Sequence, residues 1–136
     1  MPLPLEPDAD ALTIEALGGR AAITALVAAR IYDRIPDDPV WPLLRVTTVS
    51  DLEAADPVGW DLVEQVDVFG KSGSRQDTYD ARTIARTIRA HSRDMVGTYS
   101  SGTIRACGAG SIQDLGPDPD TGRAHFSVEL NLSIYT

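Results

Sequence analysis

Residues 124–135 read AHFSVELNLSIY, and apolar and polar side chains alternate along the whole segment. Successive side chains of a β-strand point to opposite faces of the sheet, so this alternation is typical of a strand with one buried face. The apolar set is Phe126, Val128, Leu130, Leu132 and Ile134. We therefore predict a half-exposed antiparallel strand over residues 124–135.

A turn and a second strand precede this segment. The run GPDPDTG, residues 116–122, is composed of the residue types that favour turns. Before it, the segment from Thr103 to Leu115 has a strand-like composition, with Gly108 and Gly110 in its interior. Glycine inside a strand often marks a bulge or a bend. The end of the chain is thus predicted to form a hairpin whose first strand is irregular.

A second hairpin is predicted in the middle of the chain. Two β-rich segments, Leu43 to Leu52 and Trp60 to Gly70, flank a polar connection from Glu53 to Gly59. In the second segment the apolar face holds Trp60, Leu62, Val66 and Val68, and the polar face holds Asp61, Gln65 and Asp67. Glu64 interrupts the apolar face, so we expect it near a rim or an interface.

The clearest helical pattern runs from about Arg75 to Met95. Ser74 followed by Asp77 resembles a capping box at its start. Its apolar stripe consists of Ala81, Ile84, Ala85, Ile88 and Met95, and a second face carries Arg82, Arg86, Arg89 and Arg93. Two shorter helices are predicted over residues 8–17, with Asp8 or Asp10 as N-cap, and over residues 20–29. A short extended piece follows at residues 30–33.

This order of elements predicts an α+β fold. A chain of 136 residues has the size of a single domain, which we place at residues 1–136, with residues 1–7 expected to be flexible. We expect an antiparallel or mixed sheet of about four to five strands, with helices packed on one face.

Composition and charge exclude several classes of protein. The net charge of −8 argues against general affinity for nucleic acid, which needs a basic surface. Neither a bilayer-spanning apolar run nor an N-terminal leader pattern is seen, so we expect no membrane partner and no export. The single cysteine, Cys107, excludes an internal disulfide.

No catalytic motif is complete. Gly70-Lys71-Ser72 resembles the end of a P-loop, but Gln65 occupies the position of the required first glycine. The two glycines at 108 and 110 lack the third glycine of a dinucleotide-binding motif, because Gln113 stands there. The 116–122 turn lacks further calcium ligands, and His91, His125 and Cys107 have no metal-ligand spacing. We therefore expect no enzyme, no metal and no cofactor.

The arginine-rich helix face admits three interpretations. It is a solvated surface, a contact surface for an acidic neighbour such as a second copy, or a site for DNA phosphate, which the net charge disfavours. The acidic residues in the other half of the chain that suit the second interpretation are Glu53, Asp56, Asp61 and Asp67.

Four segments together resemble a known family. They are ARIYDRIP (29–36), WPLLRVTT (41–48), VDVFGKSG (66–73) and ARTIARTI (81–88), and they follow a helical N-terminus. In this order they resemble the tail terminator (tail completion, minor tail protein U-like) proteins of long-tailed bacteriophages. The resemblance covers most of the chain.

The resemblance implies a non-enzymatic virion protein that forms a ring, usually a hexamer, on the head-proximal end of the tail tube. Such a ring would end tube polymerisation and provide the interface for head–tail joining. The implied partners are other copies of the chain, the major tail tube protein and the neck protein (head-completion or stopper protein). Assembly would occur in the host cytoplasm. Genome DNA would pass through the lumen without specific binding, so we expect Asp or Glu side chains to face it.

Two surfaces are expected to make contacts in such a ring. The candidate subunit-contact residues are Arg82, Arg86, Arg89, Arg93, Asp61 and Asp67. The candidate tube-facing or neck-facing residues, in the Asp51 to Asp61 connection, are Asp51, Glu53, Asp56 and Trp60. Two alternatives remain open, namely another neck component, such as a head-completion or stopper protein, and a small cellular ligand-binding module with a deep pocket.

Overall fold

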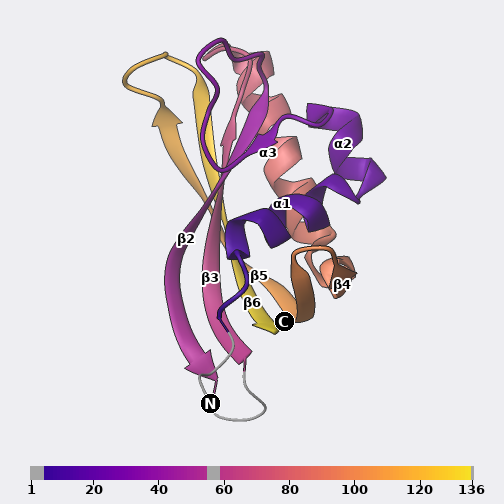
Figure 1. The fold of residues 1–136 in the computed structure, drawn as a ribbon. Coiled ribbons are helices and arrows are strands. Elements are labelled where there is room, and N and C mark those ends of the chain that lie inside the picture. The colour runs from indigo at the N-terminus through magenta and orange to yellow at the C-terminus, as the bar shows by residue number, and fades with distance from the viewer. Residues whose placement is uncertain (1–4, 55–58, 136) are drawn as a thin grey trace.

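The computed structural model describes residues 5–54 and 59–135, and for residues 51–54 it describes the backbone alone. Within these residues, helices cover one face of a curved sheet (Figure 1). The elements are α1 (Ala9–Gly18), α2 (Ala21–Val27), β1 (Ile31–Tyr32), β2 (Leu43–Ala54), β3 (Gly59–Phe69), α3 (Arg75–Ala90), the 3₁₀ helix η1 (Ser92–Met95), β4 (Gly97–Tyr99), β5 (Gly102–Pro117) and β6 (Ala124–Tyr135).

The described strands form one six-stranded sheet in the order β1-β2-β3-β6-β5-β4. β1 is parallel to β2, and every other neighbouring pair is antiparallel. The α+β class and the one-sided helical cover are therefore confirmed. The short extended piece expected at residues 30–33 is confirmed as β1. The strand number exceeds the expected four to five because β4, of three residues, is too short to produce a sequence pattern.

The alternating segment 124–135 is confirmed as β6, which lies between β3 and β5. Its five apolar side chains are buried on the helix-covered face. The register of β5 on β6 shifts between Ala109 and Ile112, which confirms a bulge near Gly110, whereas Gly108 pairs regularly with Asn131. The predicted middle hairpin is confirmed as β2 and β3.

The helix starts agree with the sequence and two of the ends do not. The side chain of Asp8 accepts a hydrogen bond from the Ala11 amide, and that of Ser74 from the Asp77 amide. α3 ends at Ala90, where Ser92 Oγ donates to the Arg89 carbonyl, a local bond that competes with helix continuation. α2 ends at Val27 because Ala28 takes a left-handed φ of 55°.

Two remaining expectations concern the N-terminal segment and membrane-spanning helices. The flexible segment expected at residues 1–7 lies in part outside the described residues. Across the residues that are described, no helix is both long enough and apolar enough to span a bilayer.

The interruption of the apolar face of β3 had led us to expect Glu64 near a rim or an interface, and this expectation is wrong. The Glu64 side chain is fully buried under α1, on the helix-covered face of the sheet. Its Oε1 atom lies 3.3 Å from Thr13 Oγ1 and 3.2 Å from Thr48 Oγ1. Each of these hydroxyls also has a closer acceptor, the Ala9 carbonyl and Asp10 Oδ1 respectively. Burial, reinforced by the negative charge of Asp10, raises the pKa of Glu64 to about 8. At neutral pH the carboxyl is therefore largely protonated.

Replacing this carboxyl should change how stability depends on pH. Between the ordinary pKa of 4.5 and about 8, the folded state keeps a proton that the unfolded chain releases, so wild-type stability falls as pH rises through this range. Glu64→Gln should flatten this dependence and raise the free energy of unfolding above pH 8 by about 2–4 kcal/mol. Urea unfolding from pH 4 to 9 measures it. Glu129→Gln, at an exposed position of β6, is the control, and an unchanged slope in E64Q would contradict the assignment.

Candidate assembly surfaces

One flank of α3 presents arginines beside the sheet. Arg82, Arg86 and Arg89 line a shallow hollow of about 230 Å³ together with Ile112, Asp114 and Phe126. Within the described chain, Arg82 has an ion pair with Asp114 at 3.7 Å, whereas Arg86 and Arg89 are exposed and have no ion pair. We call Arg82, Arg86 and Arg89 the basic flank. It lies against β5, the strand next to the short edge strand β4.

Arg93 does not continue this flank. Because α3 ends at Ala90, Arg93 belongs to η1, where it is exposed and does not line the hollow. Three of the four arginines that the sequence placed on one helix face are thus brought together.

The sheet face opposite the helices is uncovered and polar. A hollow of about 390 Å³ on this face is lined by side chains from all four long strands, which are Val49, Ser50, Val63, Gln65, Ser111, Gln113, Ser127 and Glu129. Asp61 lies on the same face, near the start of β3. Its side chain is exposed and accepts a hydrogen bond of 2.5 Å from Ser133 Oγ. We call this surface the uncovered face.

Asp67, the second candidate contact residue on β3, is buried within the subunit. Its carboxyl is 1% exposed and accepts from Arg45 Nη2 at 3.0 Å and Gln65 Nε2 at 2.9 Å, while His125 Nε2 lies 3.0 Å away. These partners already satisfy both carboxylate oxygens. The alternation of β3 placed Asp67 correctly on the polar face but gave no sign that neighbouring strands cover it.

Aromatic rings extend this cluster to the end of the sheet. His125 stacks on Phe69 with ring centroids 4.3 Å apart, and Trp41 meets Phe69 edge-on at 5.9 Å. The Arg123 guanidinium lies 4.3 Å from the centre of the Trp41 ring. These contacts hold the loop before β2 beside the 116–122 turn.

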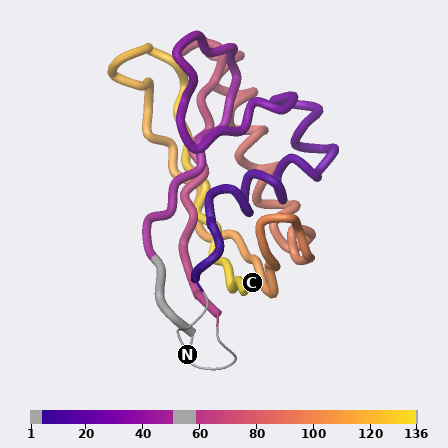
Figure 2. Tube along the Cα trace, viewed as in Figure 1, coloured from indigo at the N-terminus to yellow at the C-terminus, as the bar shows by residue number. Residues whose placement is uncertain are grey.

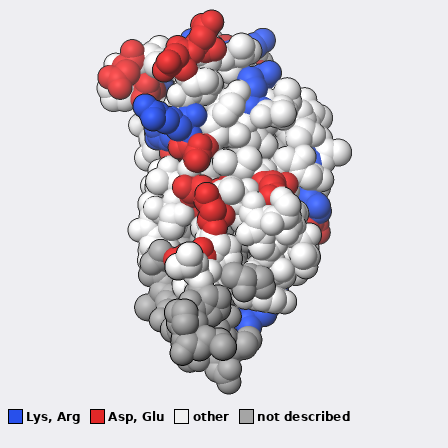
Figure 3. Space-filling view, viewed as in Figure 1, with Lys and Arg blue, Asp and Glu red and all other residues white. Residues whose placement is uncertain are grey.

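This end of the molecule is acidic. The loop between β1 and β2 and the 116–122 turn lie side by side at the same end (Figure 2). Acidic side chains gather over both in the space-filling view (Figure 3). The exposed members in the loop are Asp33, Asp37 and Asp38, and Arg34 offsets one of these charges. Among the described residues these three carboxylates have no hydrogen bond or ion pair.

The expected tube-facing or neck-facing residues are described only in part. Asp51 and Glu53 belong to β2 by their backbone, and their side chains, like the whole of Asp56, lie outside the described part of the chain. Trp60 is the second residue of β3, and its partly buried side chain packs against the core. The contact expected at this connection therefore remains a prediction.

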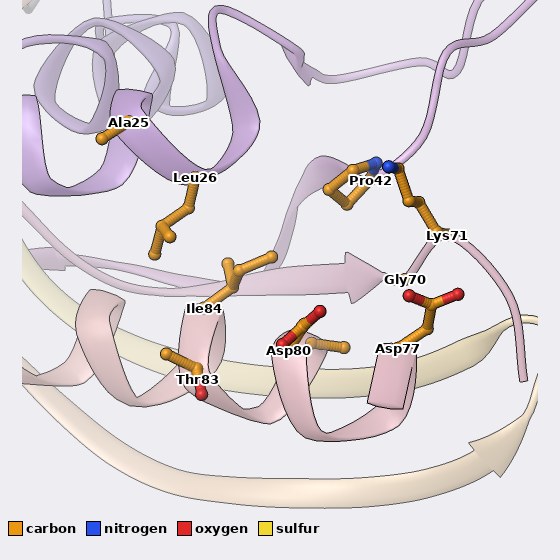
Figure 4. Close-up of a pocket in the computed structure, with 10 residues that line it drawn as sticks. Ala25, Leu26, Pro42, Gly70, Lys71, Asp77, Asp80, Thr83 and Ile84 are labelled. Atoms are coloured by element: carbon orange, nitrogen blue, oxygen red, sulfur yellow. The ribbon is translucent and has the colours of Figure 1, made fainter. Parts of the chain in front are cut away.

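A groove of about 370 Å³ lies between α2 and α3 (Figure 4). Leu26 and Ile84 line its apolar part, and Lys71, Asp77 and Asp80 lie along its rim. Asp77 is engaged by Ser72 Oγ at 2.6 Å and Asp80 by Gln76 Nε2 at 2.9 Å. The two rim carboxylates are thus engaged by local hydrogen bonds.

Local structure explains the shifted pKa values of two further groups, Cys107 and Glu15. Burial raises the pKa of the Cys107 thiol to about 11, which keeps it protonated and unreactive. Hydrogen bonds from Ser100 and Ser101 lower the pKa of Glu15 and join α1 to the turn after β4. Across the described chain, no three His, Cys, Asp or Glu side chains are grouped so that they could hold a metal ion.

A sheet that is covered on one face only and has bare strand edges leaves surface on which other proteins can pair. The family model for tail completion protein gp17 matches residues 12–136, so the chain belongs to the tail completion protein gp17 family. It is thereby a structural protein of the bacteriophage virion tail, as the resemblance in the sequence implied.

A solved structure of a virion particle contains a chain with the same fold. A chain in the virion of a native gene transfer agent (GTA) particle superposes with a TM-score of 0.71 at 13% identity, covering 93% of each chain. A second solved chain has a TM-score of 0.49 at 18% identity, covering 95% of this chain and 99% of its own length. No curated protein sequence matches the chain.

The Asp67 cluster can be tested by its effect on stability. Asp67→Asn keeps the size of the side chain but removes a buried charge that receives bonds from Arg45 and Gln65. The free energy of unfolding should fall by about 1.5–3 kcal/mol, the range for hydrogen bonds to charged groups. Asp61→Asn, on the exposed part of the same face, should cost less than about 1 kcal/mol. Equal effects in urea unfolding would show that the cluster does not stabilise the sheet.

Proposed function

We propose that this protein forms a ring, most simply a hexamer, on the head-proximal end of the tail tube. The ring ends tube polymerisation and provides the surface to which the neck joins. Membership in the tail completion family supports the location. The main structural observation is that Arg86 and Arg89 of the basic flank are exposed and have no ion pair within the described chain, which supports association with an acidic partner. The tube protein, the neck protein and further copies of the chain are the proposed partners.

The subunit contacts in this ring are assigned to the basic flank. Each subunit of a ring must present two different surfaces that fit one another. Arg86 and Arg89 supply one such surface, with positive charge that nothing else in the described chain neutralises. Asp67 is dropped from the proposed contacts because its charge is satisfied internally, and Asp61 is placed on a different surface, the uncovered face.

Deleting the gene from the parent phage tests the proposal. Electron microscopy of the lysate should show overlong or irregular tails without heads, and a plasmid copy of the wild-type gene should restore tails of normal length. Tails of normal length beside unattached filled heads would instead place the protein in the neck. Normal infectious particles would contradict a role in the tail altogether.

The basic flank is tested in the same complementation. The double variant Arg86→Glu, Arg89→Glu should fail to restore normal tails, because like charges would then face each other across the subunit contact. Both side chains are exposed, so the purified variant should unfold within about 0.5–1 kcal/mol of wild type. Lys71→Glu, Arg75→Glu makes the same change in charge at exposed positions around the start of α3 and should restore tails. Normal tails with R86E/R89E would remove the basic flank from the interface.

A further inference from the structure

The outermost strands β1 and β4 are short and leave most of the outer edges of their long neighbours, β2 and β5, bare. β1 pairs with only two residues of β2, Leu44 and Arg45, and β4 pairs with only the first three residues of β5. Beyond these pairs, no described backbone group bonds to the outer edges of residues 46–50 in β2 or 106–113 in β5. Unpaired edges of this length are ready templates for pairing with another strand.

The sense of the two edge strands suits pairing between copies. β2 is antiparallel to β3, β3 to β6, and β6 to β5, so β2 and β5 run in opposite directions. In a ring whose axis runs roughly along the strands, the rotation that relates one copy to the next leaves the direction of each strand unchanged. The β5 edge of one copy therefore meets the β2 edge of the next in antiparallel sense, and a single repeated contact continues the sheet.

The charges beside the two edges are complementary. The basic flank lies against β5, where Arg82 pairs with Asp114. Asp114 stands in one row of the sheet with Phe126, Val68 and Leu44, so Arg82 lies at the height where β2 begins. The acidic β1–β2 loop, with Asp33, Asp37 and Asp38, leads into β2 at that height. Arg82 thus lies at the height of this acidic loop, and Arg86 and Arg89, unpaired within the described chain, follow about one and two turns further along α3, beside the same edge.

Among the residues whose side chains are described, β2 and β5 each expose a large apolar side chain. Val49, at the bulge of β2, is 54% exposed, and Leu115 in β5 is 48% exposed. A strand paired along these edges would place cross-strand neighbours beside both side chains and partly cover them.

We propose that the β5 edge of one subunit pairs with the β2 edge of the next copy, so that the sheets join into one closed barrel. The basic flank then contacts the acidic β1–β2 loop of the neighbour. This inference rests on the proposed ring and names its interface. The helices make the subunit wider on their side of the sheet. Because the outer circumference of a ring is longer than the inner one, the helices lie on the outside. The uncovered face, with Asp61 and Glu129, lines the channel.

Cysteine cross-linking tests the pairing. Thr47 and Gln113 are exposed on the uncovered face, one on each edge strand, and Ser111 lies two residues from Gln113. In a Cys107→Ser background, the pairs T47C/Q113C and T47C/S111C bracket the register. Tails complemented with each variant are isolated under reducing conditions, oxidised and run on non-reducing denaturing gels. At least one pair should give a ladder of multiples of the single-chain mass.

The controls separate this inference from the proposed function. Single-cysteine variants should give no ladder beyond a dimer, and neither should A22C/Q113C, which places one thiol on exposed α2. Tails of normal length without a ladder from either pair would overturn the edge pairing and leave the ring standing. Tails of normal length after deletion of the gene would overturn the proposed function itself.

A charge exchange tests the same contact without cysteines. Asp37→Arg, Asp38→Arg should block complementation, as R86E/R89E should. Combining the four substitutions restores opposite charges across every contact, and complementation should return to at least a tenth of the wild-type plaque count. Continued failure of a combined variant that folds normally would contradict contact between the basic flank and the loop.

Discussion

The sheet buries only one of its faces, and most other features of the molecule follow from this constraint. Alternating strands such as β6 satisfy it by directing apolar side chains under the helices and polar ones outward. The covered face closes a core around Phe126 and Met95. The opposite face and the two long edges have no cover within the described chain. A protein of this design keeps a folded core by itself and leaves its remaining sheet surface for partners.

Two acidic residues of β3 show that the two faces of the sheet provide different environments for a carboxyl group. Glu64 points into the covered face, where burial favours the protonated form. Asp67 points to the uncovered face and is enclosed by Arg45, Gln65 and His125, which supply donors for a carboxylate. The first residue therefore links stability to pH, and the second fixes the end of the sheet through the stacked rings of Phe69 and His125.

The sequence predicts the elements far better than it predicts the surfaces. Period-two alternation locates β3 and β6, and the Ser74 cap locates the start of α3, because these signals are local. The burial of Glu64 and Asp67 depends on which strands and helices lie beside β3, so no pattern within β3 reveals it. The end of α3 was misplaced since Met95 remains buried in η1 and continues the apolar pattern. The bare edges of β2 and β5 become visible only once the strand order is known.

The family assignment gives the protein its place in the virion tail, and the bare edges of β2 and β5 are the surfaces by which we propose that a ring closes. The most direct measurement is a cryo-electron microscopy reconstruction of the head-proximal end of isolated tails, at a resolution that separates strands. We predict one ring of this protein, with β5 of each subunit beside β2 of the next and Asp61 and Glu129 facing the channel. A ring with Arg82, Arg86 and Arg89 facing the channel, or no ring at that end of the tail, would contradict it.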